Sequence, residues 1–177
     1  MDIDFNTVEK AVRGDGEVFA KLVEERKDML YRTAFLYVKN QQDALEIVDS
    51  AVYKAYVSIK KLKKPEFFNT WITKILINCA VDLLRYRKRV VQLSENYDDV
   101  YIESDSTISI DLYNAVDKLQ GKCKTVIILK YYNNLKISEV AEIMECSESN
   151  VKNYIHKALK ELRINFDEGG EYADGRI

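Results

Sequence analysis

The chain has 177 residues, of which 47% are apolar and 32% charged, a composition that suits a packed core with a soluble surface. The longest apolar runs are shorter than the roughly 18 residues of a membrane span, and the net charge of −2 excludes a uniformly basic protein. One proline and six glycines provide few strand and turn signals, so a helical protein is expected.

The cysteines, the single histidine and the N-terminal residues indicate the cellular compartment and exclude several classes of protein. The three cysteines, Cys79, Cys123 and Cys146, are widely spaced in apolar surroundings and are expected to be buried thiols in a reducing cytoplasm. The acidic start, MDIDFNTVEK, has neither the basic nor the apolar region of a signal peptide. With His156 as the single histidine and no glycine-rich phosphate loop, the sequence predicts no enzyme, no metal site and no cofactor.

The charges are strongly segregated along the chain. Residues 54–89 carry 10 basic and 2 acidic side chains, and residues 118–163 carry 9 and 5. Between them, residues 90–117 carry no basic and 7 acidic side chains. Basic blocks on helices are usually solvated faces. Two such blocks around an acidic spacer favour two nucleic-acid contacts joined by a segment that avoids phosphates.

The first half of the chain shows helical spacing of apolar residues, with polar breaks between the segments. Gly14 is the predicted stop of the first helix and Asp15 the cap of the next, while Asp43 opens the third. A basic and aromatic loop, KKLKKPEFF, contains the only proline and leads into the last helix. The predicted helices of this first domain span residues 5–13, about 18–38, 43–59 and 69–89.

The helix predicted for residues 69–89 is apolar on one side and basic at its end. Its last turns carry Arg85, Arg87, Lys88 and Arg89. Cations favour a helix C-terminus, but that effect accounts for one or two of them. Four cations together indicate a polyanion as the partner.

Periodicity disappears from 90 to 109, a stretch rich in Ser, Asp and Glu that is typical of an extended linker. Helical spacing returns at residue 110 and continues to about 165, followed by an acidic tail over 166–177 that is expected to be disordered. Residues 137–162 predict two short helices joined by a turn at 145–147, with Ser147 capping the second. This arrangement is a helix-turn-helix.

Three segments together resemble a sigma-70 family factor of the small, extracytoplasmic-function type, over residues 12–163. DALEIVDSAVYKAY resembles the helix that contacts the RNA polymerase clamp, and FFNTWITKILINCAVDLLR the segment that melts and reads the −10 element. ISEVAEIMECSESNVKNYIHKALKELR resembles the −35 reading domain. The resemblance implies an all-α protein with a sigma-2-like four-helix domain at 1–89 and a sigma-4-like helix-turn-helix domain at 110–165, joined by the extended acidic linker.

In a −35 domain, the first turns of the recognition helix enter the major groove. Asn150 and Asn153 suit adenine and Glu148 suits cytosine, whereas lysines and histidine suit phosphates. The alternative is a solvated helix face. The outward positions are Glu148, Ser149, Asn150, Lys152, Asn153, His156 and Lys157.

In a −10 domain, unstacked bases need aromatic or apolar surface and the backbone needs cations. The resemblance implies that a flipped base lies against the 60–68 loop and that Lys74 and Asn78 help to read the strand. The alternative places Trp71 and one phenylalanine in the core. The candidate residues are Lys60, Lys61, Lys63, Lys64, Phe67, Phe68, Trp71, Lys74, Asn78 and Arg85.

The candidate polymerase surface is acidic and consists of Asp43, Glu46 and Asp49. The chain departs from the family here, because Asp49 and Ser50 replace the usual Gln-Glu pair and Val52 replaces an aromatic residue. Ordinary helix solubility explains the same acidic residues.

The helix-turn-helix segment also departs from the family. Glu145 replaces the turn glycine, and Asn134 stands where the family often has glycine. Lys136 stands at the start of the first helix, where Ser or Thr would be the better cap.

The function implied by the resemblance is promoter-specific initiation of transcription, with −35 recognition and −10 melting. The implied partners are core RNA polymerase, promoter DNA and an anti-sigma factor, often membrane-bound, with no small-molecule substrate, and the linker would thread through the polymerase. Two alternatives stay open. One is a dimeric helix-turn-helix regulator with residues 12–86 as its oligomerisation or effector domain. The other is an interaction protein without promoter selectivity.

Overall fold

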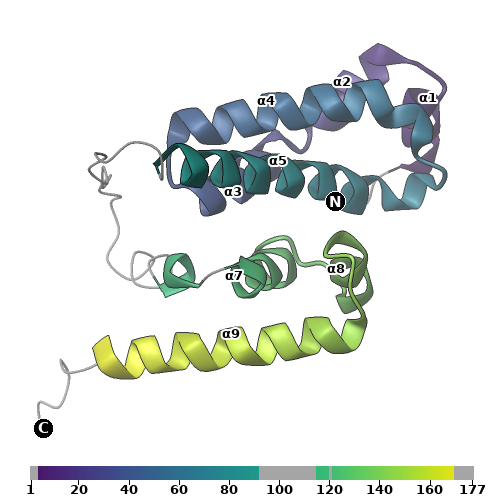
Figure 1. Ribbon diagram of the computed structural model, residues 1–177. Helices are drawn as coiled ribbons and strands as arrows, with labels where there is room; N and C mark the ends of the chain where they lie inside the picture. The colour runs from purple at the N-terminus through teal and green to yellow at the C-terminus, as the bar shows by residue number, and fades with distance from the viewer. Residues whose placement is uncertain (1–3, 92–114, 120, 170–177) are drawn as a thin grey trace, which may run out of the picture. The chain divides into compact units, whose positions relative to one another are not determined.

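The computed structural model describes residues 4–91, 115–119 and 121–169, without the side chains of 88, 90, 91 and 164–169. The chain divides into two compact units, Met1–Ile102 and Glu103–Ile177, and each is taken by itself. The described residues form helices and no strand, as the sequence predicts (Figure 1). The acidic stretch 92–109, predicted as a linker, lies outside the described residues.

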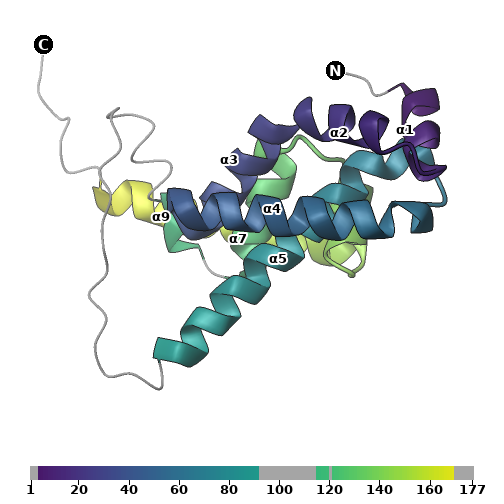
Figure 2. The ribbon, with the colours of Figure 1, turned by 90° about the horizontal axis from the view of Figure 1, so that it is seen from above.

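The first unit is a bundle of helices in which the last one, α5, is the longest. Short 3₁₀ turns, η1 at Ile59–Lys61 and η2 at Pro65–Phe67, connect α4 to α5. Figure 2 shows the C-terminal turns of α5 projecting from this bundle. The helices are α1 (Phe5–Val12), α2 (Gly16–Glu24), α3 (Lys27–Val38), α4 (Gln41–Ser58) and α5 (Phe68–Val91).

The predicted stop and cap near the N-terminus are confirmed. Gly14 has a φ of 107°, a backbone conformation that residues with a side chain rarely adopt, and it ends α1. The Asp15 carboxylate accepts a hydrogen bond from the Val18 backbone N–H at 3.0 Å, so Asp15 is the N-cap of α2. At the start of α4, Asn40 is the cap, and the helix begins at Gln41, two residues before the predicted start.

The single helix predicted from about 18 to 38 is wrong, because the structure has two helices with a break at Arg26. The Arg26 backbone N–H closes the last turn of α2 on the Val23 carbonyl, and the Arg26 carbonyl accepts the first bond of α3 from Leu30. The apolar residues keep the same spacing on both sides of this break. Periodicity therefore gives no sign of it.

The core of the first unit lies where α5 packs against α3 and α4. Residues 65–87 are long and apolar enough to cross a membrane by length and composition alone. In the bundle, however, Phe68, Ile72, Leu76 and Ala80 of this segment are fully buried. Fully burying one such large side chain is worth roughly 1.5–3 kcal/mol, and α5 is accordingly the core helix of the unit.

Two helices extend past their predicted ends. Helix α5 continues to Val91, into the first two residues of the predicted linker. Helix α9 (Glu148–Gly169) runs on to the first glycine after Gly121, so residues 166–169 are helical where a disordered tail is predicted. No glycine or proline stands earlier in either segment to end the helix.

The second unit contains the predicted helix-turn-helix. A helical turn at 115–118 precedes α7 (Gly121–Ile127), which continues as a π-helical turn over Ile128–Tyr132. Helix α8 (Ile137–Ile143) and α9 then pack together, with Val140 and Val151 completely buried. The apolar Leu159 of α9 is an exception, because it is 45% exposed.

The turn keeps its geometry although Glu145 replaces glycine. Glu145 adopts a left-handed conformation with φ of 51°, and the Cys146 N–H donates to the Ala141 carbonyl at 3.0 Å. Ser147 accepts from the Asn150 N–H at 3.2 Å, which confirms it as the cap of α9. At the start of α8, the Glu139 carboxylate accepts from the Lys136 N–H at 2.7 Å and supplies the reciprocal half of a capping box.

The cysteines generate a first prediction. Cys79 and Cys123 are each 6% exposed, whereas Cys146 is half-buried. Burial, with a smaller contribution from Glu161, raises the pKa of the Cys123 thiol and leaves less thiolate at neutral pH. Iodoacetamide should therefore modify Cys146 first, with Cys123 at least about tenfold slower, because a buried thiol reacts only after local opening. Mass spectrometry of peptides from native and denatured protein checks the order, and equal native rates would contradict it.

Candidate nucleic-acid interface

The loop between α4 and α5 presents four lysines to solvent because two apolar residues hold it down. Ile59 and Leu62 are 4% and 8% exposed and anchor the loop on the bundle. The remaining loop positions consequently point outward. All four lysines of the loop are exposed: Lys60, Lys61, Lys63 and Lys64.

Three aromatic residues at the start of α5 have different environments. Phe67 and Trp71 are half-buried, and the Lys64 Nζ atom lies 5.5 Å from the centroid of the Phe67 ring. Phe68 is completely buried, so its predicted contact with DNA is corrected to a place in the core. The Phe68 ring lies 6.0 Å from that of Trp71, centroid to centroid, and supports it from beneath.

Along α5, four predicted residues share one face. Trp71, Lys74, Asn78 and Arg85 recur at steps of three, four and seven, which keeps them on one stripe. Asn78 and Arg85 are exposed, and Lys74 is half-buried. Asp82 lies on the same stripe, with its carboxylate 3.9 Å from the Arg85 guanidinium. We use the name loop–α5 surface for Phe67, the four loop lysines and the α5 residues Trp71, Lys74, Asn78 and Arg85.

The second candidate surface is the recognition helix α9. Its inner side is held by Val151 and Ala158, both fully buried. The predicted outward positions are all exposed: Glu148, Ser149, Asn150, Lys152, Asn153, His156 and Lys157. The Lys157 ammonium lies 3.9 Å from the Glu161 carboxylate, one turn further along α9.

The acidic candidates on α4 divide into two kinds. Glu46 and Asp49 are exposed, as a docking surface requires. Asp43 is only 6% exposed and forms an ion pair with Arg87 of α5. Its predicted place on the polymerase surface is therefore corrected to a structural one. Arg87, part of the predicted polyanion contact, is likewise engaged by Asp43.

Sequence reasoning missed an apolar groove beside Asp49. The groove has a volume of about 630 Å³ between α2 and α4 and is lined by Phe19, Tyr53 and Tyr56 among others. Tyr53 and Tyr56 of α4 are 69% and 54% exposed. The sequence does contain one sign of this groove, because Tyr53 and Tyr56 are three positions apart and therefore share a face of the helix. No set of three metal-binding side chains occurs within the described ranges.

Both candidate surfaces lie in segments that match known protein families. Residues 22–90 match the family described as Sigma-70 region 2, and residues 109–162 match Sigma-70, region 4. The RNA polymerase sigma factor SigV of Bacillus subtilis is 38% identical over 148 residues, covering 80% of this chain and 87% of SigV. The ECF RNA polymerase sigma factor SigW of the same organism is 28% identical and covers 88% of this chain and 92% of SigW.

Solved structures show the same fold. The sigma factor RpoE from Bartonella quintana, in complex with the anti-sigma factor NepR, aligns with a TM-score of 0.74 at 21% identity. The alignment covers 84% of this chain and 96% of that one. CnrH, in complex with the cytosolic domain of CnrY, aligns with a TM-score of 0.73 at 20% identity over 93% and 97% of the two chains.

These matches settle the class of protein. The chain belongs to the sigma-70 family of RNA polymerase sigma factors, in the extracytoplasmic-function group. The predicted family and the predicted all-α fold are both confirmed. The loop–α5 surface lies within the match to region 2, and the exposed face of α9 lies within the match to region 4.

The two kinds of acidic residue on α4 can be separated by stability. Asp43→Asn removes the negative charge opposite Arg87 and should lower the free energy of unfolding by about 1.5–3 kcal/mol, the range for a hydrogen bond to a charged group. Glu46→Gln and Asp49→Asn are the matched controls on the exposed face and should change it by less than about 0.5 kcal/mol. Urea unfolding followed by circular dichroism measures all three. A wild-type midpoint for Asp43→Asn would contradict the structural role.

Proposed function

We propose that this sigma factor brings core RNA polymerase to promoters through two separate DNA contacts. The loop–α5 surface would open and hold the −10 element, and the N-terminal turns of α9 would read the −35 element. The single observation behind this proposal is that both sets of residues reach the surface while buried apolar side chains hold the segments that carry them. The loop lysines, Asn78, Arg85 and the α9 residues are exposed, and Phe67, Trp71 and Lys74 are half-buried. The corresponding functional division is residues 1–89, 90–109, 110–165 and 166–177.

At −10, the protein has to stabilise separated strands. The half-buried Phe67 and Trp71 offer ring surface on which an unstacked base can lie, and the four loop lysines neutralise the strand's phosphates. Asn78 carries both a donor and an acceptor and can satisfy the polar edge of a flipped base. Phe68 takes no part in this contact because it is buried.

At −35, α9 would enter the major groove of intact duplex DNA. Asn150 and Asn153 can each donate to and accept from adenine, and Glu148 can accept from cytosine. Lys152, His156 and Lys157 lie on the same exposed helix and would contact phosphates, which fixes the register without specifying sequence. Such phosphate contacts make the binding depend on salt.

Docking on core polymerase would use α4. Glu46 and Asp49 supply exposed negative charge, and the groove beside Asp49 adds Tyr53 and Tyr56. Aromatic residues with a charged rim are typical of protein interfaces. Asp43 is left out of this surface.

Regulation would be through an anti-sigma factor. One solved structure of similar fold, RpoE, is in complex with the anti-sigma factor NepR, and another, CnrH, is in complex with the cytosolic domain of CnrY. We propose an anti-sigma partner here as well, one held at the membrane, with the sigma factor itself acting in the cytoplasm. The protein acts as an initiation factor and not as an enzyme, and it needs no cofactor of its own.

The proposal is tested by run-off transcription with core polymerase on a library of random promoters. Lys74→Ala and Asn78→Ala should each reduce open-complex formation about tenfold, since each removes a contact made only to the opened strand. Lys21→Ala and Asn6→Ala are matched controls at exposed positions away from the loop–α5 surface. Permanganate reactivity of unpaired thymines reports the opening. Normal initiation by both test variants would disprove the −10 assignment, and enrichment of no promoter by the wild type would disprove the function.

The −35 assignment gives a separate prediction. Asn153→Ala should cost about 1–3 kcal/mol and relax selection at one base pair, because it removes base-edge contacts. Lys152→Ala should weaken binding on all sequences alike and lower the salt slope by about one. Lys118→Ala serves as the exposed control in the same unit. Holoenzyme binding to promoter variants at several salt concentrations separates the two effects, and a uniform loss with Asn153→Ala would count against base reading.

A further inference from the structure

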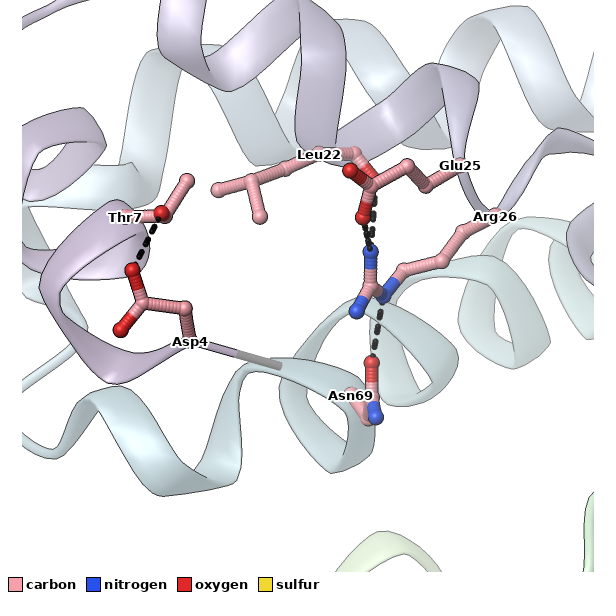
Figure 3. A network of polar contacts seen from close by, with 6 residues as sticks. All are labelled: Asp4, Thr7, Leu22, Glu25, Arg26 and Asn69. Atoms are coloured by element: carbon pink, nitrogen blue, oxygen red, sulfur yellow. Dashed lines mark hydrogen bonds and ion pairs between the residues drawn. The ribbon is translucent and has the colours of Figure 1, made fainter. Parts of the chain in front are cut away.

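Arg26 is a buried arginine at the break between α2 and α3, and neither candidate DNA surface contains it. The residue as a whole is 9% exposed. Its guanidinium donates from Nη1 to the Leu22 carbonyl at 3.0 Å and to the Glu25 carboxylate at 3.2 Å. From Nε it donates to the Asn69 side-chain oxygen at 2.7 Å (Figure 3).

The bond to Asn69 joins two segments that are far apart in the sequence. Leu22 and Glu25 lie within one helical turn of Arg26, so those two bonds stay local. Asn69 stands in the first turn of α5, directly after Phe67 and Phe68. A buried guanidinium requires its acceptors, and this bond therefore ties the break between α2 and α3 to the start of α5.

A second contact runs in parallel. The guanidinium carbon of Arg26 lies 5.6 Å from the centroid of the buried Phe68 ring. Phe68 in turn packs beside Trp71, with the two rings 6.0 Å apart and inclined by 41°. Arg26 is thus linked to the loop–α5 surface twice, through Asn69 and through Phe68.

Direct contact between Arg26 and DNA is excluded by its burial, since its side chain is only 10% exposed. Its partner Glu25 is 57% exposed, and that ion pair contributes little to stability. What the arrangement does fix is the position of the first turn of α5, and with it the two half-buried rings of Phe67 and Trp71.

We propose that Arg26 is a positioning residue for capture of the −10 base. It holds Phe67 and Trp71 in the geometry that accepts an unstacked base and thereby sets base selectivity without touching the DNA. This inference rests on the proposed −10 role of the loop–α5 surface. It concerns a residue that lies outside that surface.

Arginine is required here because of its shape. The planar guanidinium donates in two directions, to Leu22 and to Asn69, while its central carbon lies over the Phe68 ring, 5.6 Å from the centroid. A lysine ammonium keeps the charge but has neither the planar fork nor the face. Arg26→Lys should therefore fail to restore selectivity.

The test is a cycle that combines protein variants with changes in the DNA. Holoenzymes with wild-type protein, Arg26→Gln, Arg26→Lys or Asn69→Ala initiate on promoters in which each non-template −10 base in turn is replaced by an abasic nucleotide. In the wild type, one position should reduce initiation by about tenfold or more when abasic, because its base is the one captured. In all three variants that ratio should fall to near one, a coupling of the size seen between contacting residues.

Controls separate positioning from general stability. Arg32→Gln removes an exposed arginine from α3 and should keep the wild-type ratio. Asn69→Asp keeps an acceptor for Arg26 and should also keep the ratio. Loss of folded protein lowers initiation on the intact and abasic promoters alike and leaves their ratio unchanged. Asn69→Ala removes only the acceptor, so the test stands even if both Arg26 variants fail to fold.

The outcomes are distinct. A wild-type ratio in the three variants overturns the inference and leaves the proposed −10 function intact. A wild type that is indifferent to every abasic position overturns both, because no base is then captured. Ratios near one in the variants, with a normal ratio in Arg32→Gln and Asn69→Asp, support the positioning role.

Discussion

The burial of one side of α5 is the constraint on which the rest of the first unit depends. Phe68, Ile72, Leu76 and Ala80 are withdrawn from water against α3 and α4. With that side occupied, the stripe that begins at Trp71 faces outward along the same helix. The basic loop before α5 is held in turn by the buried Ile59 and Leu62. Core packing and the candidate DNA surface are consequently two sides of the same residue pattern.

In the second unit, burial of one side of a helix likewise leaves its polar side exposed. The buried Val151 and Ala158 of α9 turn its polar positions toward solvent, and the turn before the helix sets its direction. That turn uses Glu145 in a left-handed conformation, which disfavours residues with a side chain by about 1 kcal/mol or more. The Cys146 and Asn150 hydrogen bonds around it hold this geometry.

Much of this organisation could be predicted from the sequence, because it depends on local patterns. Helical periodicity, the Asp15 and Ser147 caps and the exposed face of α9 all follow from residues within a few positions of one another. The misplaced residues depend on distant partners. Phe68 and Phe67 are adjacent and chemically identical, and only the bundle decides which of them is buried. Asp43 is an ordinary acidic helix residue until α5 brings Arg87 to it, and Arg26 at the break between α2 and α3 finds an acceptor in the distant Asn69.

Both candidate DNA surfaces contain their own counter-charge, Asp82 beside Arg85 and Glu161 beside Lys157. Because the whole chain carries a net charge of −2, the molecule has little long-range attraction toward DNA, although its two candidate surfaces are basic. At physiological salt, exposed charges are screened beyond about 8 Å. We therefore expect the free protein to have a low affinity for nonspecific DNA. A uniformly basic DNA-binding protein would instead be held at nonspecific sites. Its search for promoters would be governed by the enzyme that carries it.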